Sequence, residues 1–572
     1  MKGFQDFQDF RRSGQWRDET VLDDLRRSVA NHPDKPALVC YRDGAAETVT
    51  YAELARRVDR LAASLVRLGV GRGDVVTLQL PNSWQLVASI LACARIGAVA
   101  GPVVPIMRRR EVEFMTRLTE SPVYIAATEF RGFSYADMSA EVARAVPSLR
   151  HRVLLGGGDG VHGGGGDGIG DGIGDGGADN GGGEGDGGRG GALDFDRDLL
   201  GPEPTAEEIA ALDALEAGPD DPAQVVFTSG TTGEPKGVVH SHNTLYSMNR
   251  AQADVLHLTG DEVTAMGSPT THQAGYTWNF LMPLILGATA VQVDAWDPAV
   301  MLRILEERRV TFFMGAPTFL SDLIEAQRTG PRDLSALLTF ATGSAPIAPL
   351  LVEDAREVLG CRVYALWGMS ENGCVTITRP EDPPMRAAES DGTPVPGMEV
   401  RIVGRGGEPV AAGQPGLLQV RGAAQCLGYF RRPEVYAESL TEDGWFDTGD
   451  LAREDGYGGI RITGRVKDVI MRGAENIPVV EVEAALLRHP SVKDVAVVGY
   501  PDRRLGERAC AILVTADSPA ASPLTLDDMR GHLSGLGMAK QYWPERLEIV
   551  PSLPRTPSGK IQKFALRDRL RA

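Results

Sequence analysis

Residues 225–242 read VVFTSGTTGEPKGVVHSH, and this stretch is the strongest local signal of structure in the chain. Its apolar start is typical of a buried strand, and a run of Ser, Thr and Gly leads from there to Lys236. Glycines let backbone N–H groups approach phosphate oxygens, hydroxyls add donors, and the lysine adds positive charge. The sequence therefore predicts a phosphate-binding loop that follows a strand.

A Walker-type loop is excluded by spacing. That motif requires G-x-x-x-x-G-K-[ST], whereas Pro235 precedes Lys236 here and Gly237 follows it. An ordinary glycine-rich turn is the alternative, and the length of the motif disfavours it.

On both sides of this stretch, strand-like and helix-like segments alternate. Apolar residues at Leu54, Val58, Leu61 and Leu65 have the spacing of one helical face. Residues 74–80 predict a buried strand and residues 83–97 a helix, and strands are also expected at 223–229, 288–293 and 309–315. This rhythm predicts an α/β fold in which helices cover parallel sheets.

The pattern changes twice toward the C-terminus. Residues 391–463 contain short strands separated by glycine and proline, which indicates a β-rich subdomain. After Arg465 the chain predicts a compact α+β unit with a helix at 480–489, strands at 494–500 and 509–516, and a closing helix after Ile561. We expect an N-terminal domain of residues 1–464 and a smaller, mobile C-terminal domain of residues 465–572.

Residues 156–191 stand apart, because 22 of these 36 positions are glycine and seven are acidic. Such a segment buries almost nothing, so a disordered surface insertion is the expectation. A calcium-binding glycine–aspartate repeat needs a regular nonapeptide with apolar anchors, and only Ile169 and Ile173 approach that pattern.

Composition narrows the functional class. The net charge of −18 disfavours a nucleic-acid binder, which normally carries a basic face. The most apolar stretch, 87–106, is interrupted by Arg95, Gly97 and two prolines, so a buried helix and strand are expected there rather than a membrane span. Six separated cysteines and no export signal predict a cytoplasmic protein with reduced thiols and no zinc site.

The glycine-rich loop resembles the phosphate-binding signature of the adenylate-forming superfamily, which includes acyl-CoA synthetases, peptide-synthetase adenylation domains and luciferases. Further segments resemble other motifs of this family and follow in the same order along the chain. The resemblance spans nearly the whole chain outside the insertion. The matching segments are TGSAP (342–346), ALWGMSENG (365–373), GWFDTGDLA (444–452), GRVKDVIMRGAENIPVVEVE (464–483) and PRTPSGKIQK (554–563).

The resemblance implies ATP, magnesium and coenzyme A as cofactors and assigns roles to residues. Glu371 and Thr232 are implied as magnesium ligands and, with Lys560, as catalytic residues. The implied nucleotide-binding residues are Thr228, Ser229, Gly230, Thr231, Thr232, Gly233, Lys236, Gly343, Ser344, Ala345, Pro346, Trp367, Gly368, Met369, Ser370, Asp450 and Arg465.

Each principal role suits the chemistry, because a carboxylate that attacks an α-phosphate meets strong negative charge. Lys560 would stabilise that transition state, and Glu371 would give magnesium one hard oxygen ligand. Asp450 offers two acceptor oxygens to the ribose hydroxyls, and Arg465 adds a donor. Each residue also has a purely structural alternative: a solvated lysine for Lys560, a surface glutamate for Glu371, a turn aspartate for Asp450 and a surface ion pair for Arg465.

The second half-reaction needs a different arrangement. Lys467 lies where the family has a hinge, and the resemblance implies that the C-terminal domain swings between the two steps. Gly473 and Ala474 would border the path of coenzyme A. Ala474 replaces a glycine common in the motif, so its methyl group narrows the backbone approach there.

By resemblance, residues 268–280 (SPTTHQAGYTWNF) line an acyl pocket that includes His272, Tyr276 and Trp278. A packed, hydrogen-bonded histidine is an equal alternative for His272. The segment has no carboxylate to hold an amino acid's ammonium group, which favours a non-amino acid. The stretches 14–27 and 78–114 look most like medium-chain and cyclohexanecarboxylate-type ligases.

We therefore expect an AMP-forming acid–CoA ligase of fatty acid metabolism, acting on a fatty or alicyclic acid, with no nucleic-acid partner. An enzyme that loads an acyl carrier protein shares all the adenylation residues and stays open. An inactive nucleotide-binding protein is disfavoured because Lys560, Glu371 and Asp450 are all present. Nothing in the sequence indicates a luciferase-like oxygenase.

Overall fold

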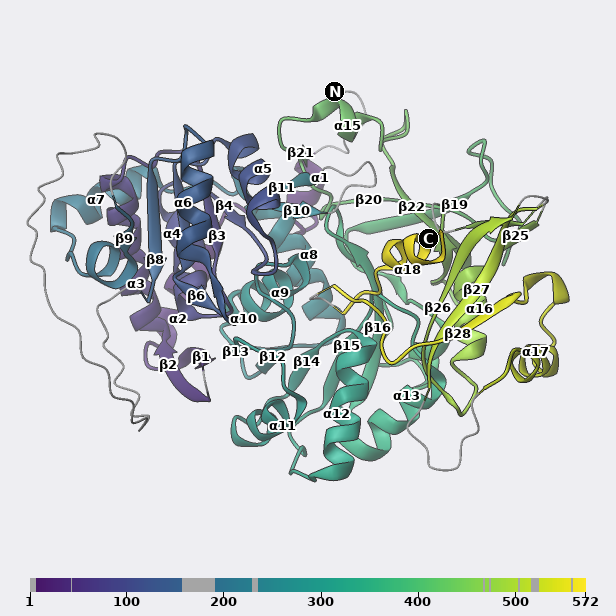
Figure 1. Ribbon diagram of the computed structural model, residues 1–572. Helices are drawn as coiled ribbons and strands as arrows, with labels where there is room; N and C mark the ends of the chain where they lie inside the picture. The colour runs from purple at the N-terminus through teal and green to yellow at the C-terminus, as the bar shows by residue number, and fades with distance from the viewer. Residues whose placement is uncertain are drawn as a thin grey trace, which may run out of the picture.

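Parallel strands form the centre of two large sheets in the computed structural model. The structure describes residues 7–42, 44–156, 191–228, 235–466, 469–472, 475–502, 505–515, 524–556 and 559–571. Figure 1 shows the first sheet (blue) and the second (teal) side by side, with the C-terminal elements (yellow) at the end of the molecule opposite β8 and β9. The expected α/β class is confirmed.

The first sheet is parallel from β10 to β9 and antiparallel at its other edge, β10–β11–β21. Its central strand β3 is buried at every position, as its apolar run predicts. Its described strands, in spatial order, are β21 (Gly428–Tyr429), β11 (Lys236–Ser241), β10 (Pro222–Thr228), β4 (Val99–Pro102), β3 (Val75–Gln79), β5 (Val123–Ala127), β8 (His151–Leu155) and β9 (Leu193–Asp194).

The second sheet has the same design, with parallel central strands and antiparallel strands at both edges. Its described strands, in spatial order, are β18 (Thr393–Pro394), β17 (Gly373–Ile377), β16 (Arg362–Met369), β15 (Thr339–Thr342), β14 (Phe312–Met314), β12 (Val263–Met266), β13 (Thr289–Val293), β1 (Pro36–Arg42) and β2 (Ala45–Thr50).

Helices connect these strands, and their sequence signals are visible in the structure. Thr50 and Glu53 form a capping box at the start of α3 (Tyr51–Arg67), whose predicted apolar face is buried. The expected helix at 83–97 is α4 (Trp84–Arg95). The other long helices are α2 (Val21–Asn31), α5 (Arg109–Thr119), α6 (Tyr135–Ala145), α7 (Ala206–Leu215), α8 (His242–Val255), α11 (Pro298–Glu307) and α12 (Pro317–Thr329).

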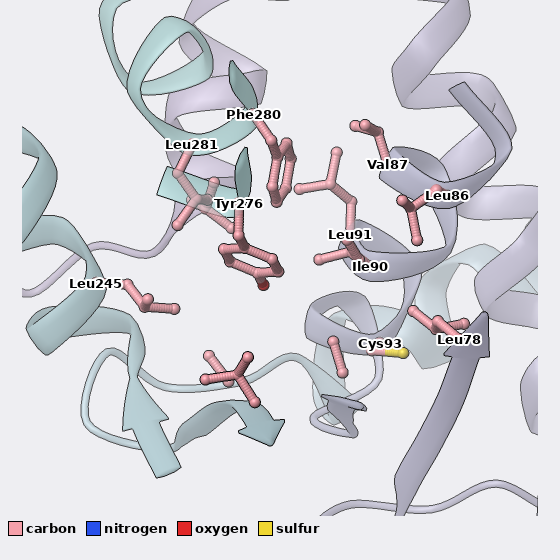
Figure 2. Packing of buried hydrophobic residues seen from close by; sticks show 14 of the residues in the cluster. Leu78, Leu86, Val87, Ile90, Leu91, Cys93, Leu245, Tyr276, Phe280 and Leu281 are labelled. Atoms are coloured by element: carbon pink, nitrogen blue, oxygen red, sulfur yellow. The ribbon is translucent and has the colours of Figure 1, made fainter. Parts of the chain in front are cut away.

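One shared core joins the two sheets. Helix α4 is mostly apolar, and all of its residues except Gln85 are buried, as expected for a helix inside a core. The short helices α9 (Gln273–Tyr276), η2 (Thr277–Leu281) and α10 (Met282–Leu286) follow β12 and enter the same core. Figure 2 shows Tyr276 and Phe280 beside Ile90 and Leu91 of α4, with Leu78 of β3 below them.

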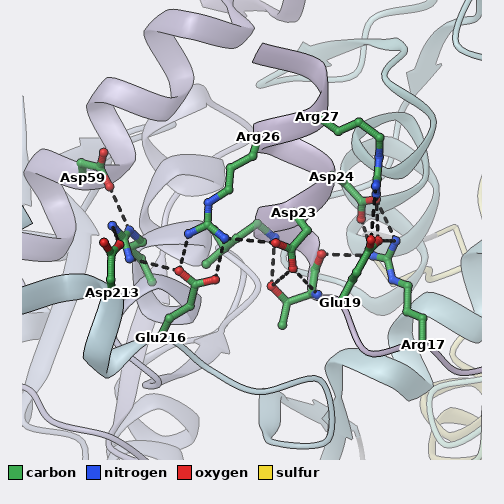
Figure 3. A network of polar contacts seen from close by, with 12 residues as sticks. Arg17, Glu19, Asp23, Asp24, Arg26, Arg27, Asp59, Asp213 and Glu216 are labelled. Atoms are coloured by element: carbon green, nitrogen blue, oxygen red, sulfur yellow. Dashed lines mark hydrogen bonds and ion pairs between the residues drawn. The ribbon is translucent and has the colours of Figure 1, made fainter. Parts of the chain in front are cut away.

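A network of ion pairs fixes helix α2 to its surroundings (Figure 3). Arg95 of α4 is only 7% exposed, yet its guanidinium contacts Asp59 at 3.0 Å, Asp213 at 2.6 Å and Glu216 at 3.0 Å. Arg26 of α2 pairs with the same Glu216. A buried charge is tolerated only when it is paired, so this shared carboxylate links α2 to α4 and the end of α7.

The β-rich region is an antiparallel sheet of β19 (Met398–Val403), β20 (Gly416–Gly422), β22 (Phe446–Glu454) and β23 (Ile460–Arg465). After it, a separate sheet contains β24 (Ile470–Arg472), β25 (Glu475–Ile477), β26 (Val492–Asp502), β27 (Gly506–Thr515) and β28 (Arg546–Ile549). Its helices are α16 (Val479–Leu486), α17 (Leu526–Gly535) and α18 (Lys563–Arg571). The expected elements are confirmed, although α16 ends before residue 489 because Pro490 follows.

No helix in the described parts of the chain combines the length and apolar character that a membrane crossing needs. The stretch at 87–106 forms α4 and β4, as expected. All six cysteines are buried and form no disulfide. The glycine-rich segment falls outside the described residues, apart from its two ends.

Candidate functional site

The predicted phosphate loop connects two paired strands. Thr228, the last residue of β10, lies opposite Lys236, the first residue of β11. Residues 229–234, which include the expected Thr232, fall outside the described residues. The two ends of the loop are therefore held next to each other at the carboxyl end of β10.

Lys236 lies beside Tyr429, a residue that the sequence analysis missed. Its Nζ is 4.7 Å from the centroid of the Tyr429 ring, and β11 pairs directly with the strand that carries Tyr429. The Tyr429 hydroxyl donates to Glu371 Oε1 at 2.9 Å. Three segments distant in sequence thus meet here, and a lone tyrosine nearly 200 residues from the loop gave no signal of it.

Glu371 occupies the connection between β16 and β17 and is 7% exposed. Its backbone is fixed on both sides: its carbonyl accepts from Cys426 N–H at 2.7 Å, and the Ser370 carbonyl accepts from His240 Nε2 at 2.7 Å. Burial raises the pKa of Glu371 above its usual range. The Tyr429 hydrogen bond lowers that pKa, as does the charge of Lys236.

This carboxylate suits a magnesium ion. Its Oε1 accepts from the Tyr429 hydroxyl, and a carboxylate has a second oxygen that a metal ion can bind. A buried carboxylate favours a nearby cation. Magnesium is commonly held by one or two carboxylates together with phosphate oxygens and waters. The described residues contain no group of three or more His, Cys, Asp or Glu side chains arranged to hold a metal.

Asp450 forms a second polar group at the end of β16. It is 5% exposed, and its two oxygens have different partners: Oδ2 accepts from Trp367 Nε1 at 2.9 Å, and Oδ1 forms an ion pair with Arg465 Nε at 2.8 Å. Asp450 and Arg465 are cross-strand partners on β22 and β23. Strand register therefore fixes this ion pair, and Trp367 connects it to the strand that leads to Glu371.

The loop 343–346 follows β15, next to β16. Gly343 has no room for a side chain, because a Cβ there would lie 2.5 Å from the Leu366 carbonyl oxygen. Ser344 has a φ of 73°, the left-handed region that non-glycine residues rarely adopt. Ala345 and Pro346 complete the turn. Such strain is concentrated at functional sites, and this loop adjoins Trp367.

His272 is close enough to Lys560 for the lysine charge to act on it, although 288 positions separate the two residues. His272 caps α9, with Nδ1 accepting from Ala274 N–H at 3.3 Å. Burial, and to a lesser extent the charge of Lys560, lower the pKa of His272 to about 4. This histidine is therefore neutral near pH 7.

A tight turn carries Lys560 to this place. Its backbone N–H donates to Thr556 Oγ1 at 3.1 Å, and its carbonyl accepts from Thr556 N–H at 2.8 Å. Next to it, Gly559 has a φ of 84°, and a Cβ there would lie 3.0 Å from Ala316 Cβ and from Thr318 Oγ1. The lysine turn thus rests on the start of α12, after the carboxyl end of β14.

Tyr276 and Trp278 are not linked to the Glu371 or Asp450 groups by any contact in the described residues. Tyr276 packs edge-to-face with Phe280, and Trp278 stacks on Phe312 at 5.5 Å between ring centroids. Both belong to the shared core of the sheets. The other expected positions, Lys467, Gly473 and Ala474, lie outside the described residues.

Several of the described groups lie at the carboxyl ends of parallel strands. Thr228 ends β10, the 343–346 loop follows β15, Glu371 follows β16 and the segment 268–280 follows β12. Ligands of open α/β sheets bind outside these ends. The geometry therefore combines an anion-binding loop, a buried carboxylate, an aspartate with two acceptor oxygens and a lysine.

Comparison with known proteins agrees with this geometry. Residues 25–430 match the AMP-binding enzyme family and residues 481–560 match its C-terminal domain family. The chain is 32% identical to the medium-chain fatty-acid–CoA ligase of Escherichia coli K12 over 98% of this chain and 92% of that protein. It is 35% identical to triostin synthetase I of Streptomyces triostinicus over 98% and 96%.

Further similarities extend to other ligases and to solved structures. The salicyl-AMP ligase/salicyl-S-ArCP synthetase of Mycobacterium tuberculosis is 31% identical over 97% of this chain and 92% of its own length. The fold matches the anthranilate CoA ligase AuaEII bound to anthranoyl-AMP with a TM-score of 0.82 and 24% identity, over 98% and 99% of the two chains. The chain therefore belongs to the AMP-binding enzymes of the adenylate-forming superfamily and is an adenylate-forming acid ligase.

Proposed function

We propose that the protein is an acid–CoA ligase that converts a fatty or alicyclic acid to an acyl-adenylate and then to a coenzyme A thioester. AMP and pyrophosphate are the other products. The observation that carries this proposal is the place of the turn that holds Lys560. That turn packs on the start of α12, and the charge of Lys560 acts on His272 in the segment expected to hold the acid.

In the first step, a carboxylate oxygen of the acid attacks the α-phosphorus of ATP, and pyrophosphate leaves. Lys560 neutralises charge that develops on the phosphate oxygens. Neutral His272 leaves the positive charge at this end to Lys560. A magnesium ion held by Glu371, with Thr232, would supply further charge neutralisation.

ATP is held at three places in this proposal. The loop from Thr228 to Lys236 holds the phosphates. Asp450 accepts from the ribose hydroxyls, because each of its oxygens has one lone pair left after bonding Trp367 and Arg465. The loop of residues 343–346 lies against the adenine, where Gly343 permits a close backbone approach.

In the second step, the thiol of coenzyme A loses its proton to solvent, its sulfur attacks the acyl carbon, and AMP leaves. The charge of Lys560 acts on the acid segment in this structure. Lys560 therefore has to move away before the thiol can reach the acyl carbon. We propose that residues 465–572 rotate about Lys467 for this purpose, as a domain separate from residues 1–464. Gly473 and Ala474 then border the thiol's path.

An acyl carrier protein is the second candidate acceptor. The relative from Mycobacterium tuberculosis has a name that includes a carrier-protein product, whereas that from Escherichia coli is named a CoA ligase. Ala474 in place of a glycine narrows the expected thiol path, and this favours testing both acceptors.

AMP release measured with ATP, magnesium and a panel of acids, with and without coenzyme A, tests the proposal. The panel contains short and medium-chain, cyclohexane and benzoic acids. We expect turnover that requires coenzyme A and gives a thioester. Acid-dependent pyrophosphate exchange without any acceleration by coenzyme A would instead point to a carrier protein, and no exchange with any acid would overturn the adenylation itself.

A further inference from the structure

The turn that carries Lys560 is the tip of a short hairpin. We call its described residues, 554–556 and 559–562, the lysine hairpin. Its two sides are paired, because Arg555 and Ile561 form an antiparallel bridge. Lys560 therefore lies at the end of a paired structure.

The peptide unit before Lys560 is held at both ends. Arg555 Nη1 donates to the Gly559 carbonyl, and Lys560 N–H donates to Thr556 Oγ1 at 3.1 Å. Gly559 has a φ of 84°, and a glycine adopts either sign of φ readily. Because a peptide unit is planar, these two bonds select its orientation and hence the direction in which the lysine side chain leaves the backbone.

Arg555 is itself oriented by strand β26. Its Nη2 forms an ion pair with Asp494 Oδ2, and Asp494 Oδ1 accepts from the backbone N–H of Val495 at 2.9 Å. The guanidinium is planar, so one nitrogen fixed on Asp494 sets where the other points. A partly exposed ion pair contributes little to folding stability, whereas a planar fork with two fixed partners orients the groups that it joins.

A second contact attaches the end of the hairpin to the same strand. Glu483 of α16 is 4% exposed, and its Oε1 accepts from Val497 N–H of β26 at 2.6 Å and lies 2.7 Å from Lys563 Nζ. Lys563 directly follows the hairpin. Both attachments lie within residues 483–563, so they accompany Lys560 in any rotation of the C-terminal domain.

We propose that Arg555 is a positioning residue for Lys560 in adenylation and that Asp494 holds Arg555 in place. This inference rests on the proposed function, because Lys560 has to act on the phosphate for its position to matter. A misplacement of about 1 Å in a reacting group costs up to about 100-fold in rate. The contacts proposed for ATP belong to other segments, so loss of Arg555 should lower kcat and leave the KM for ATP nearly unchanged.

Arg555→Met tests the proposal in acid-dependent pyrophosphate exchange at varied ATP. Methionine keeps much of the apolar stem and removes both donors. We expect kcat to fall about 10- to 100-fold, with the KM for ATP within about twofold of the wild type. Thiolysis of a supplied acyl-adenylate should stay within about threefold, because Lys560 acts in the first step alone.

Arg508→Met is the matched control. Arg508 Nε lies 2.7 Å from Asp502 Oδ2, so this is another partly exposed arginine–aspartate pair, at the other end of β26. The control should exchange within about twofold of the wild type, and its urea-unfolding midpoint should match that of Arg555→Met.

A double variant separates positioning from a general structural defect. Since Arg555 acts through Lys560 in this proposal, Arg555→Met loses its effect once the lysine is gone. Arg555→Met/Lys560→Ala should therefore exchange within about twofold of Lys560→Ala alone. A defect that spreads through the domain would instead slow both backgrounds by the same factor.

The outcomes separate the two proposals. Exchange with no acid would overturn the proposed function, and a Lys560→Ala enzyme that exchanges like the wild type would overturn the role of that lysine. Where neither occurs, three results would overturn only the inference: an Arg555→Met rate close to that of the control, a raised KM for ATP in place of a lower kcat, or an equal loss in both backgrounds. Should Arg555→Met not fold, Asp494→Asn removes the charge that holds Arg555 and should lower kcat in the wild-type background but not in Lys560→Ala.

Discussion

Asp450→Asn is the most informative single substitution in the nucleotide site. An asparagine keeps one acceptor oxygen and exchanges the other for an NH2 group. The remaining oxygen is held at Trp367, because that indole N–H is buried and has no other acceptor among the described residues. The NH2 group then faces Arg465 and the proposed ribose hydroxyl, and it accepts from neither.

Two different magnitudes follow from the structure. Arg465 has a side-chain exposure of 49%, so the loss of its ion pair costs about 0–1 kcal/mol of unfolding free energy. A hydrogen bond from a ribose hydroxyl to an ionised acceptor contributes about 1.5–3 kcal/mol, so losing one raises the KM for ATP about 10- to 150-fold. The variant should therefore fold nearly as well as the wild type and bind ATP much more weakly.

The assay is acid-dependent pyrophosphate exchange at varied ATP, with urea unfolding of the same preparations. Asp447→Asn is the matched control, because Asp447 lies on the same strand and its described bond, from Gly449 N–H to Oδ1, needs only an oxygen. We expect less than a twofold change in KM for that control. A folded Asp450→Asn enzyme with a KM for ATP within threefold of wild type would refute the ribose assignment.

Three other substitutions test separate parts of the reasoning. Lys560→Ala should slow adenylation by on the order of 10²–10³ but leave thiolysis of a supplied acyl-adenylate within threefold; equal loss in both assays would contradict its role. Burial lowers the pKa of His240 to about 4, so the unfolded state binds more protons between pH 6.5 and 4, and stability falls as the pH falls through this window. His240→Gln should therefore reduce the change of unfolding free energy with pH between pH 4 and 6.5, by up to about 1.4 kcal/mol per pH unit. The same pH dependence in the variant and the wild type, measured by urea unfolding, would refute the prediction. Glu216→Gln should lower the free energy of unfolding in urea by about 1–2 kcal/mol, because it weakens the pairing of buried Arg95. Asp213→Asn changes an exposed carboxylate and should lower it by less than about 1 kcal/mol. Equal losses in the two variants would contradict the argument.

Much of this protein was predictable from local sequence. The helical spacing of Leu54, Val58, Leu61 and Leu65 and the capping residue Thr50 define α3, and the uninterrupted apolar run at 75–79 defines the centre of a parallel sheet. Periodicity and capping are local properties, so the sequence states them directly. The motifs also identified the superfamily, because the chemistry of phosphate and carboxylate binding restricts residue types at fixed spacings.

The partners of those motif residues required the tertiary structure. Tyr429 reaches Glu371 because β21 pairs with β11, and Trp367 reaches Asp450 because two separate sheets meet. Strand order and register between distant segments depend on packing of the whole chain, and no local pattern encodes them.

The acid segment shows the same division most clearly. The sequence by itself determined that residues 268–280 lack a carboxylate. It did not show which of Gln273, Tyr276 and Trp278 pack in the shared core of the two sheets. Only the tertiary structure placed the two aromatic rings in the shared core and left the Gln273 amide buried beside a thioether. The physical reason is that a side chain can bind a ligand only through polar atoms that have no hydrogen-bond partner within the protein. Contacts between elements far apart in the chain decide which atoms those are.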